Sequence, residues 1–592
     1  MTDEMRVPRL LEDYRTGRRR AGDVVHRARA RAAASEQPAW IALLSSAALE
    51  SHLARADPAG PLYGVPFAIK DNIDLAGVPT TAACPTFART PRRHAGAVER
   101  LLRAGAVPVG KTNMDQFATG LVGTRTPHGS CWSTIDPRHI SGGSSSGSAV
   151  AVAEGQVSFA LGTDTAGSGR VPAAFNELVG LKPSFGLIGA SGVVPACRTL
   201  DCVTVFTADV AGAAAVLEVA GGSDPADPFS RTLVPLAPAG AAPRIAVPRE
   251  GQIDFAGDHQ SRDAFRRALE RAQALGWVLQ QIDVEPLLQV ASLLYDGPWV
   301  AERAAAVGAF IAEHADDVDP VVSAIITSGW RPSAVDAFRA MYRLAELRAQ
   351  AERAWDGCQA LLMPTAPTIF THEQIAADPV AHNSTLGAYT NFVNLLDLCA
   401  IAVPGPRRAD GLPFGISLIA LAGGDQRVLA LAAEWTGEAM AHAPAVWTGK
   451  ADAPAPVEEG LIPLAVVGAH LAGQPLNGEL TRRGGRLLRR TRTAGHYRLY
   501  ALAGGHPPRP GLEASDAGGP GIEVELWGLS PTALGELTAG VPAPLAIGRV
   551  ELEDGEQVSG FVCEPRGIHG AREITHLGGW RAHLLVQAPA RG

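Results

Sequence analysis

The stretch ISGGSSSGSAVAVAEGQVSFALGTDTAGSGRVPAAFN, residues 140–176, joins two segments rich in Gly and Ser through an apolar, strand-like segment. The first segment precedes an Ala-rich run typical of a helix, so it presents backbone N–H groups and hydroxyls at a helix N-terminus. The strand-like residues 157–162 end in a tight loop, and Pro172 then stands near the first turn of another predicted helix. The amides of the small residues 166–169 can converge on one point, which is the geometry of an oxyanion hole with a serine beside it.

Apolar strands and amphipathic helices alternate over residues 20–445. Residues 97–106 and 265–277 are predicted helices, which Gly105 and Gly276 bring to an end. The strand-like pieces are AIK (68–70), AVPVG (106–110), VSFALG (157–162), RIAVPR (244–249) and LLMPT (361–365). This alternation predicts an α/β fold with layers around one large sheet.

The composition changes at KADAPAPVEEG, residues 450–460, which is rich in Ala, Pro and acidic residues and is typical of a linker. Shorter strand candidates and Gly- and Pro-rich turns follow it. We therefore expect a first domain in residues 1–449, a linker in 450–460 and a smaller, β-rich domain in 461–592. The arginines between 482 and 492 are interpreted as a solvated basic face; the alternative is that they bind an anion or a neighbouring protomer.

Composition and charge exclude several classes of protein. Of the 592 residues, 46% are hydrophobic and 19% are charged, which is typical of a globular protein. The net charge of -8 excludes a generally basic nucleic-acid binder. There is no run of 18 apolar residues and the N-terminal segment is charged, so we expect no membrane-spanning helix and a cytoplasmic protein. The seven scattered cysteines, without a CxxC motif, predict buried thiols.

Two motifs match known patterns but stand in the wrong context. Residues 105–112, GAVPVGKT, satisfy the phosphate-loop pattern, which needs a strand before it and a helix after it. Here a predicted helix comes first, and Pro108 has no N–H to offer a phosphate, so we interpret a helix–turn–strand. Residues 143–147, GSSSG, satisfy the nucleophile-elbow pattern around Ser145, but the polar residues before them make a poor strand.

Lys70 ends the strand-like VPFAIK and is followed by Asp71, Asn72 and Asp74. A surface lysine at the end of a strand is one interpretation. If Lys70 is buried instead, desolvation lowers its pKa, and the neutral amine can take a proton from a nucleophilic serine through a second serine. Such a Ser–Ser–Lys arrangement needs no histidine. Because no HExxH motif and no histidine cluster occur, we expect neither a metal nor a cofactor.

These segments together resemble the amidase signature family, and the combination of GGSSSGS with GTDTAGSGR is highly specific for it. The resemblance implies a large mixed sheet covered by helices. It implies that Lys70 is the base, that Ser144 is the bridging serine with a cis peptide bond, and that Ser168 is the nucleophile. The implied oxyanion hole consists of the backbone amides of Thr165, Ala166, Gly167 and Ser168.

Ser144 matches the bridging position because it follows a pair of glycines, 24 residues before Ser168 and 74 after Lys70. The commoner family loop reads GGSSGGS, so Ser146 departs from it, and Ala166 replaces a common glycine. Both residues are small, so these departures leave the predicted catalytic residues unchanged.

Within that family, the chain is most similar to the allophanate hydrolases. This similarity rests on KTNMDQFATGLVGTRTPHG (111–129), LLYDGPWVAER (293–303), AHLAGQPLN (469–477) and GFVCEP (560–565). It implies that Tyr295 and Arg303 hold the substrate carboxylate, which an arginine fork suits in geometry and charge. An ordinary pairing of Arg303 on a helix surface, with Glu302 or another nearby acidic residue, is the alternative.

The resemblance also implies a reaction. Allophanate would be hydrolysed through an acyl-enzyme on Ser168 to ammonia and carbon dioxide, with no cofactor. Residues 461–592 would form an α+β domain similar to γ-glutamyl cyclotransferase folds, in which His470 is the candidate for assisting decarboxylation and a structural histidine is the alternative. We expect a homodimer, no nucleic-acid or membrane partner, and a link to a urea carboxylase or to a cyanuric-acid or biuret pathway.

Two other functions stay open. One is a different amidase, which acts on another small amide or within a glutamine-dependent amidotransferase. The other is a non-catalytic assembly or binding protein that works through residues 461–592. An activity that survives Ser168→Ala would favour this last alternative.

Overall fold

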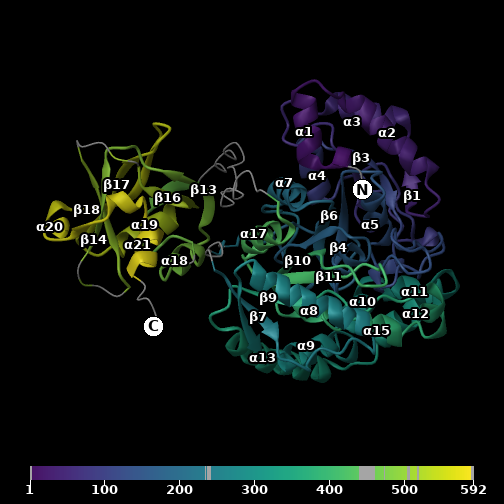
Figure 1. Ribbon diagram of the computed structural model, residues 1–592. Coiled ribbons are helices and arrows are strands. Elements are labelled where there is room, and N and C mark those ends of the chain that lie inside the picture. Colours follow the sequence, from purple (N-terminus) through teal and green to yellow (C-terminus); the bar gives the residue numbers. More distant parts are fainter. Residues whose placement is uncertain are drawn as a thin grey trace. The chain divides into compact units, whose positions relative to one another are not determined.

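The computed structural model divides the chain into two compact units, Met1–Val446 and Trp447–Gly592 (Figure 1). It describes residues 3–233, 235–236, 242–438, 461–472, 474–502, 504, 507–515, 519 and 521–587. The predicted linker, residues 450–460, lies outside the described residues, so the predicted domain boundaries stay a prediction.

The first unit is built on a mixed sheet with the strand order β1-β3-β2-β4-β6-β5-β10-β11-β9-β7-β8. In the described part of the unit, its strands are β1 Trp40–Leu43, β2 Pro66–Lys70, β3 Val107–Thr112, β4 Phe159–Asp164, β5 Val179–Lys182, β6 Cys202–Thr207, β7 Arg244–Pro248, β8 Val278–Ile282, β9 Ala360–Pro364, β10 Leu398–Pro404 and β11 Gly415–Leu421. Strand β2 runs parallel to its neighbours β3 and β4, whereas β6 is antiparallel to β4. The large sheet expected from the sequence is confirmed.

Helices cover this sheet. Figure 1 shows α2 and α3 beside β3, and α9 and α13 near β7 and β9, while α8 packs on β8. The longer helices are α1 Val7–Arg15, α2 Ala21–Ala34, α3 Ser46–Arg55, α4 Gly96–Arg103, α5 Ser146–Ala153, α7 Val210–Ala220, α8 His259–Ala274, α9 Glu285–Asp296, α12 Pro320–Ser328, α13 Ala334–Trp355 and α17 Asp425–Thr436. The shorter ones are α6 Val171–Phe175, α10 Val300–Arg303, α11 Ala309–Glu313, α14 His372–Ala377, α15 Ala381–Gly387 and α16 Asn391–Leu395. Apolar residues of α9, α13 and α16 join those of β9 and β10 in one buried core cluster.

The sequence motif GAVPVGKT has the structure that its context predicts. Helix α4 ends at Arg103, Gly105 turns the chain with a φ of +90°, and strand β3 then begins at Val107. A positive φ suits glycine because it has no Cβ. The segment is therefore a helix–turn–strand connection, in the reverse order of a phosphate loop.

The second unit is rich in strands, as expected. It contains a sheet with the order β13-β16-β12-β18-β17 and another with the order β15-β14-β19. Its described elements are β12 Ile462–Val466, α18 Asn477–Thr481, β13 Arg486–Arg492, β14 Tyr497–Ala501, β15 Pro510–Ala514, β16 Glu523–Leu529, α19 Pro531–Ala539, β17 Leu545–Glu551, β18 Gln557–Cys563, α20 Pro565–Ile568, β19 Arg572–Glu573 and α21 Trp580–Gln587.

Strand β13 differs from its prediction as a solvated basic face. It pairs with β16, and the side chain of Arg490 donates to the buried carboxylate of Glu525 at 2.9 Å. Arg489 pairs with Asp554 at 2.8 Å. The cross-strand pair with Glu525 and the pair with Asp554, in the turn after β17, offset the repulsion between neighbouring arginines and help so basic a segment to form a strand.

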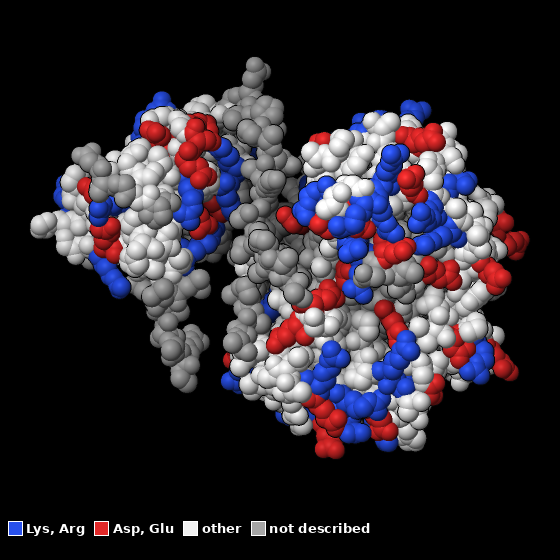
Figure 2. All heavy atoms as spheres, turned by 45° about the horizontal axis from the view of Figure 1, so that its top comes forward, with Lys and Arg blue, Asp and Glu red and all other residues white. Residues whose placement is uncertain are grey.

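The surface carries mixed charge. On the face of the first unit that Figure 2 shows, Lys and Arg side chains lie among Asp and Glu side chains. Over the described residues, we find no helix with the length and apolar character needed to cross a membrane.

Candidate active site

The candidate site lies where strands β2 and β4 end. The two strands are parallel neighbours, so their carboxyl ends meet at one edge, where Lys70 closes β2 and Thr163 and Asp164 close β4. Helix α5 packs on both strands and is preceded by the loop that carries Ser144. Buried apolar residues make up most of the strands, so this polar edge is itself taken out of water.

Lys70, Ser144 and Ser168 form one continuous chain of hydrogen bonds. The Nζ of Lys70 donates to Ser144 Oγ at 2.8 Å, and Ser144 Oγ donates to Ser168 Oγ at 2.9 Å. The peptide bond between Gly143 and Ser144 is cis. At most 2% of any of the three residues is exposed. The structure thus brings together all three residues that the resemblance singled out.

The neighbouring serines have other places in the fold. Ser145 Oγ donates to the carbonyl of Thr163 at 3.2 Å, and Ser146 is the first residue of helix α5. Of the three consecutive serines, Ser144 alone contacts both Lys70 and Ser168 in the described structure.

Burial lowers the pKa of Lys70 to about 7. The carboxylates of Asp115, Asp201 and Asp164 act in the opposite direction, and the cation of Arg303 adds to the lowering. A second acceptor, Thr163 Oγ1, lies 2.8 Å from the Nζ. The lysine is therefore held in place by two hydroxyls and is partly neutral near pH 7, so the surface interpretation of Lys70 is excluded.

Residues 165–168, here named the oxyanion loop after their predicted role, follow β4, and their backbone N–H groups donate to no backbone carbonyl of the described residues. Gly167 has a φ of +139°, and a Cβ at this position would come within 2.4 Å of Thr390 Oγ1. Glycine is therefore required here both by the backbone and by the close approach of Thr390. These N–H groups are the donors of the predicted oxyanion hole, next to Ser168 in the chain.

A buried ion pair between Asp164 and Arg170 flanks the oxyanion loop in the sequence. Arg170 donates to both carboxylate oxygens of Asp164 at 2.9 Å, and Asp164 also accepts from the backbone N–H of Gly169 at 3.0 Å. Arg170 reaches the side chain of Asn394 at 3.0 Å. Asp164 and Arg170 lie within the quoted motif, but no pattern assigned them this role, and the contact with Asn394 spans 224 residues.

Arg303 is buried beside Tyr295. Its Nη1 donates to Thr119 Oγ1 at 2.9 Å, its Nη2 donates to the Tyr295 hydroxyl at 3.4 Å, and its guanidinium lies 5.6 Å from the centre of the Tyr295 ring. Glu302 instead accepts from Thr199, at 3.0 Å from its backbone N–H. In the described structure, Arg303 has no carboxylate within ion-pair distance. The alternative pairing with Glu302 is therefore wrong.

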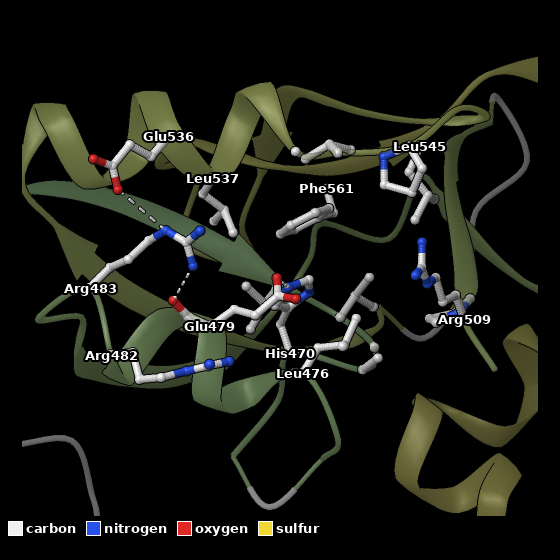
Figure 3. A pocket seen from close by; sticks show the side chains of 18 residues that line it. His470, Leu476, Glu479, Arg482, Arg483, Arg509, Glu536, Leu537, Leu545 and Phe561 are labelled. Carbon is white, nitrogen blue, oxygen red and sulfur yellow. Dashed lines mark hydrogen bonds and ion pairs between the residues drawn. The ribbon is translucent and has the colours of Figure 1, made fainter. Parts of the chain in front are cut away.

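His470 lies in the second unit, in a cavity of about 550 Å³ (Figure 3). Its Nε2 is 3.2 Å from Glu479 Oε2, and its ring stacks on Phe561 with centres 4.8 Å apart. Figure 3 shows the side chains of Arg483 and Arg509 on either side of His470. Burial lowers the pKa of His470, against the opposing effect of Glu479. The cavity thus combines the imidazole with the cationic side chains of Arg482, Arg483 and Arg509 and with the carboxylates of Glu479 and Glu536.

No group of three or more His, Cys, Asp or Glu side chains in the described parts of the chain is arranged to hold a metal ion.

The family model "Amidase" matches residues 23–429. The chain belongs to the amidase family. The model "Allophanate hydrolase C-terminal domain" matches residues 462–585, so both units of this amidase-family chain have recognised relatives.

Individual relatives agree with these matches. The urea amidolyase of Saccharomyces cerevisiae is 43% identical over 546 residues, which cover 88% of this chain but 30% of that protein. The structure of the Kluyveromyces lactis allophanate hydrolase is 38% identical with a TM-score of 0.69, covering 97% of this chain and 99% of that one. A component of the glutamyl-tRNA(Gln) amidotransferase of Synechococcus is 35% identical, over 66% of this chain and 87% of that protein. The chain spans about a third of the length of the urea amidolyases that it matches.

Proposed function

We propose that this chain hydrolyses allophanate, the carboxylate of urea, through an acyl-enzyme on Ser168. The observation that carries the proposal is Arg303, a buried guanidinium without a carboxylate partner among the described residues, in the same site as Lys70. A buried cation is costly unless it is paired, and a small anionic substrate would supply the missing charge. The similarity to an allophanate hydrolase and to urea amidolyases supports this substrate.

Some N–H groups of Arg303 remain available to bind a carboxylate. A guanidinium has five N–H groups, of which Thr119 Oγ1, the Ala118 carbonyl and the Tyr295 hydroxyl engage part. The remaining donors, together with the Tyr295 hydroxyl, suit a carboxylate in geometry and charge. In this proposal Arg303 and Tyr295 hold the substrate carboxylate and place its terminal amide beside Ser168.

The first half of the reaction forms an acyl-enzyme. With Lys70 neutral, the Ser168 proton passes to Ser144 as the Ser144 proton passes to Lys70 Nζ, along the 2.9 Å and 2.8 Å contacts. Ser168 Oγ then bonds to the terminal carbonyl carbon, and the resulting oxyanion accepts hydrogen bonds from the N–H groups of the oxyanion loop. The proton returns to the amide nitrogen, the C–N bond breaks, and ammonia leaves.

In the second half of the reaction, the same residues activate water to hydrolyse the acyl-enzyme. Water loses a proton along the same chain to Lys70 and attacks the acyl carbon, which releases Ser168 and the dicarboxylated amine. Loss of carbon dioxide from this product gives carbamate, which decomposes to a second ammonia and a second carbon dioxide. One allophanate and one water thus give two ammonia and two carbon dioxide once protons are counted.

Ammonia release from freshly prepared allophanate by the purified chain tests this proposal. Turnover of allophanate at a kcat/KM well above that of acetamide is the expected result. Hydrolysis of neutral amides with none of allophanate would contradict it and would favour the alternative amidase. Turnover of glutamine only with a partner protein would favour the amidotransferase alternative, to which the similarity with the Synechococcus protein points.

The activity is expected to fall as the pH drops through about 7. Lys70 accepts the proton only when it is neutral, and its pKa is lowered to about 7, so protonation below that pH removes the base. We expect log kcat/KM for allophanate to fall with a slope near one below pH 7 and to level off above it. Initial rates between pH 5.5 and 9 measure this limb, and melting temperatures over the same range control for unfolding. A flat profile down to pH 5.5 would contradict the assignment of Lys70 as the base.

We further propose that the cavity around His470 speeds the decarboxylation step. Arg482, Arg483 and Arg509 line the cavity and can attract a small dianion, with Arg483 also paired with Glu536 at 3.6 Å. Breaking the C–N bond of the dianion requires a proton on nitrogen, which the imidazole can deliver once it is protonated. Replacing His470 with asparagine is expected to leave the release rate of the first ammonia unchanged. Release of the second ammonia should be delayed, because the dicarboxylated amine accumulates. Ammonia and carbon dioxide followed in parallel measure the delay. If His470→Asn releases ammonia and carbon dioxide with the same time courses as wild type, His470 is a structural residue.

The source of the substrate is a further part of the proposal. We expect allophanate to come from a urea carboxylase or from a cyanuric-acid or biuret pathway, and the name of the urea amidolyase relatives supports the first source. The homodimer and the cytoplasmic location stay predictions from the sequence. Sedimentation of the purified chain measures the first of these.

A further inference from the structure

Asp201 lies beside the oxyanion loop because of the register between two strands. Strand β6 begins at Cys202 and is antiparallel to β4, and Cys202 pairs with Asp164, the last residue of β4. The residue before β6 is therefore placed against the residue after β4. This register brings Asp201 next to Thr165, across 36 residues of sequence.

The carboxylate of Asp201 is buried and accepts hydrogen bonds from uncharged donors. The Thr165 hydroxyl donates to its Oδ1, as does the backbone N–H of Cys197 at 3.2 Å, and the backbone N–H of Ala196 donates to its Oδ2 at 2.8 Å. Only 6% of the residue is exposed. No cationic side chain of the described residues lies within ion-pair distance of this carboxylate, and burying a carboxylate without such a pair costs stability. Burial raises the pKa of Asp201 to about 6, and the three donors and the cation of Arg303 oppose this rise, so the carboxylate is mainly ionised at pH 7 and above.

The turn that Asp201 closes, residues 196–201, also reaches the helix of Arg303. Cys197 Sγ donates to the carbonyl of Trp299 at 3.6 Å. Thr199 donates to the carboxylate of Glu302 from both its backbone N–H and its hydroxyl. Glu302 directly precedes Arg303 in α10. The turn is thus bonded to the oxyanion loop on one side and to the carboxylate-binding helix on the other.

From these contacts we infer that Asp201 is a positioning residue that anchors the oxyanion loop through Thr165 and sets its separation from Arg303. This inference rests on the proposed function, in which the amide carbonyl binds at the loop and the carboxylate binds at Arg303. A fixed separation selects substrates by length. It favours an amide whose carboxylate is one atom away from the scissile carbonyl, as in allophanate, over a longer homologue.

Two stable amides measure this selection. Malonamate has a CH₂ in place of the NH of allophanate and keeps its spacing, whereas succinamate is longer by one CH₂. The readout is the ratio of kcat/KM for malonamate to that for succinamate, with kcat and KM for each. A loss of folded protein would lower both rates together and leave this ratio unchanged.

The variants are Asp201→Asn, Thr165→Val and their combination, with Thr165→Ser as the conservative control that keeps the hydroxyl. Either single change is expected to lower kcat for malonamate by about 10²-fold, the effect of a small misplacement of reacting groups. We expect KM to change by less than about threefold because the contacts of Arg303 are kept. The malonamate preference should fall, and Thr165→Ser should restore both kcat and preference. The kcat of the double variant should be no lower than that of the less active single variant, because both changes remove the same interaction.

Several outcomes would overturn the inference. These are multiplicative losses in the double variant, a normal kcat in Thr165→Val, and an unchanged malonamate preference in variants with reduced kcat. Thr165→Val exchanges only a hydroxyl for a methyl group. If Asp201→Asn does not fold, the kcat and the malonamate preference of Thr165→Val therefore test the inference. If wild type hydrolyses propionamide as well as malonamate, the proposed function fails instead, and the same variants assayed on propionamide still show whether Asp201 and Thr165 act together.

Discussion

Ser168→Ala is expected to reduce ammonia release from allophanate by roughly 10⁴-fold or more, to the limit of detection. The variant lacks the oxygen that forms the acyl-enzyme, and no other hydroxyl in the described structure occupies its place next to Ser144. The oxyanion loop and Arg303 are retained, so substrate binding should be preserved. Calorimetric titration with allophanate should therefore still give a binding signal while the rate is lost.

Ser158→Ala is the matched control for this result. Ser158 is a buried serine just before β4, at the strand end opposite the site, and its hydroxyl has no partner among the described residues. Its removal should change the rate by less than about twofold. Residual activity of Ser168→Ala within tenfold of wild type would refute the nucleophile assignment and would revive a non-catalytic role for the first unit.

Arg303→Gln is expected to lower kcat/KM for allophanate by about 10²- to 10³-fold, as for loss of a buried, charge-assisted contact with a carboxylate. Most of this loss should appear in KM, because Arg303 contacts the carboxylate and not the reacting carbon. Hydrolysis of propionamide, which has no carboxylate, should change by less than about threefold. Arg303→Lys should rescue allophanate only in part, because an ammonium lacks the planar fork.

The comparison between the two substrates separates this prediction from a folding defect. Arg266→Gln serves as the control, because Arg266 is exposed and pairs with Glu270 on the surface of α8. It should leave both substrates unaffected. Equal losses on allophanate and propionamide in Arg303→Gln would mean that the arginine supports the structure and does not recognise the carboxylate.

Local sequence patterns predicted part of the first unit correctly. Strands β2, β3, β4, β7 and β9 lie where apolar runs were identified, and helices α4 and α8 end two residues before the predicted glycines, which turn the chain with a positive φ. These elements follow from hydrophobic periodicity and from glycine, which act over a few residues. Strand β13 was missed because its arginines conceal the pattern of a strand, and their partners Glu525 and Asp554 lie far along the chain.

The residues of the candidate site were likewise predictable only in part. Family motifs pointed to Lys70, Ser144 and Ser168, and the structure joins them by hydrogen bonds. No pattern pointed to Thr163 as the second acceptor of Lys70, or to Thr119 as a contact of Arg303. A contact between residues 93 or 184 positions apart depends on how whole elements pack, which no local pattern records.

The sequence by itself determined the elements with a clear hydrophobic pattern, the order of the two units and the residues of the candidate site that lie in motifs, because propensity, periodicity and motif spacing are local properties. The tertiary structure alone decided what those groups can do. Burial of Lys70 between the ends of β2 and β4 lowers its pKa to about 7, and the packing around Arg303 leaves its charge without a carboxylate among the described residues. Both effects depend on how much water and which charges surround a group, and distant segments of the chain set those surroundings.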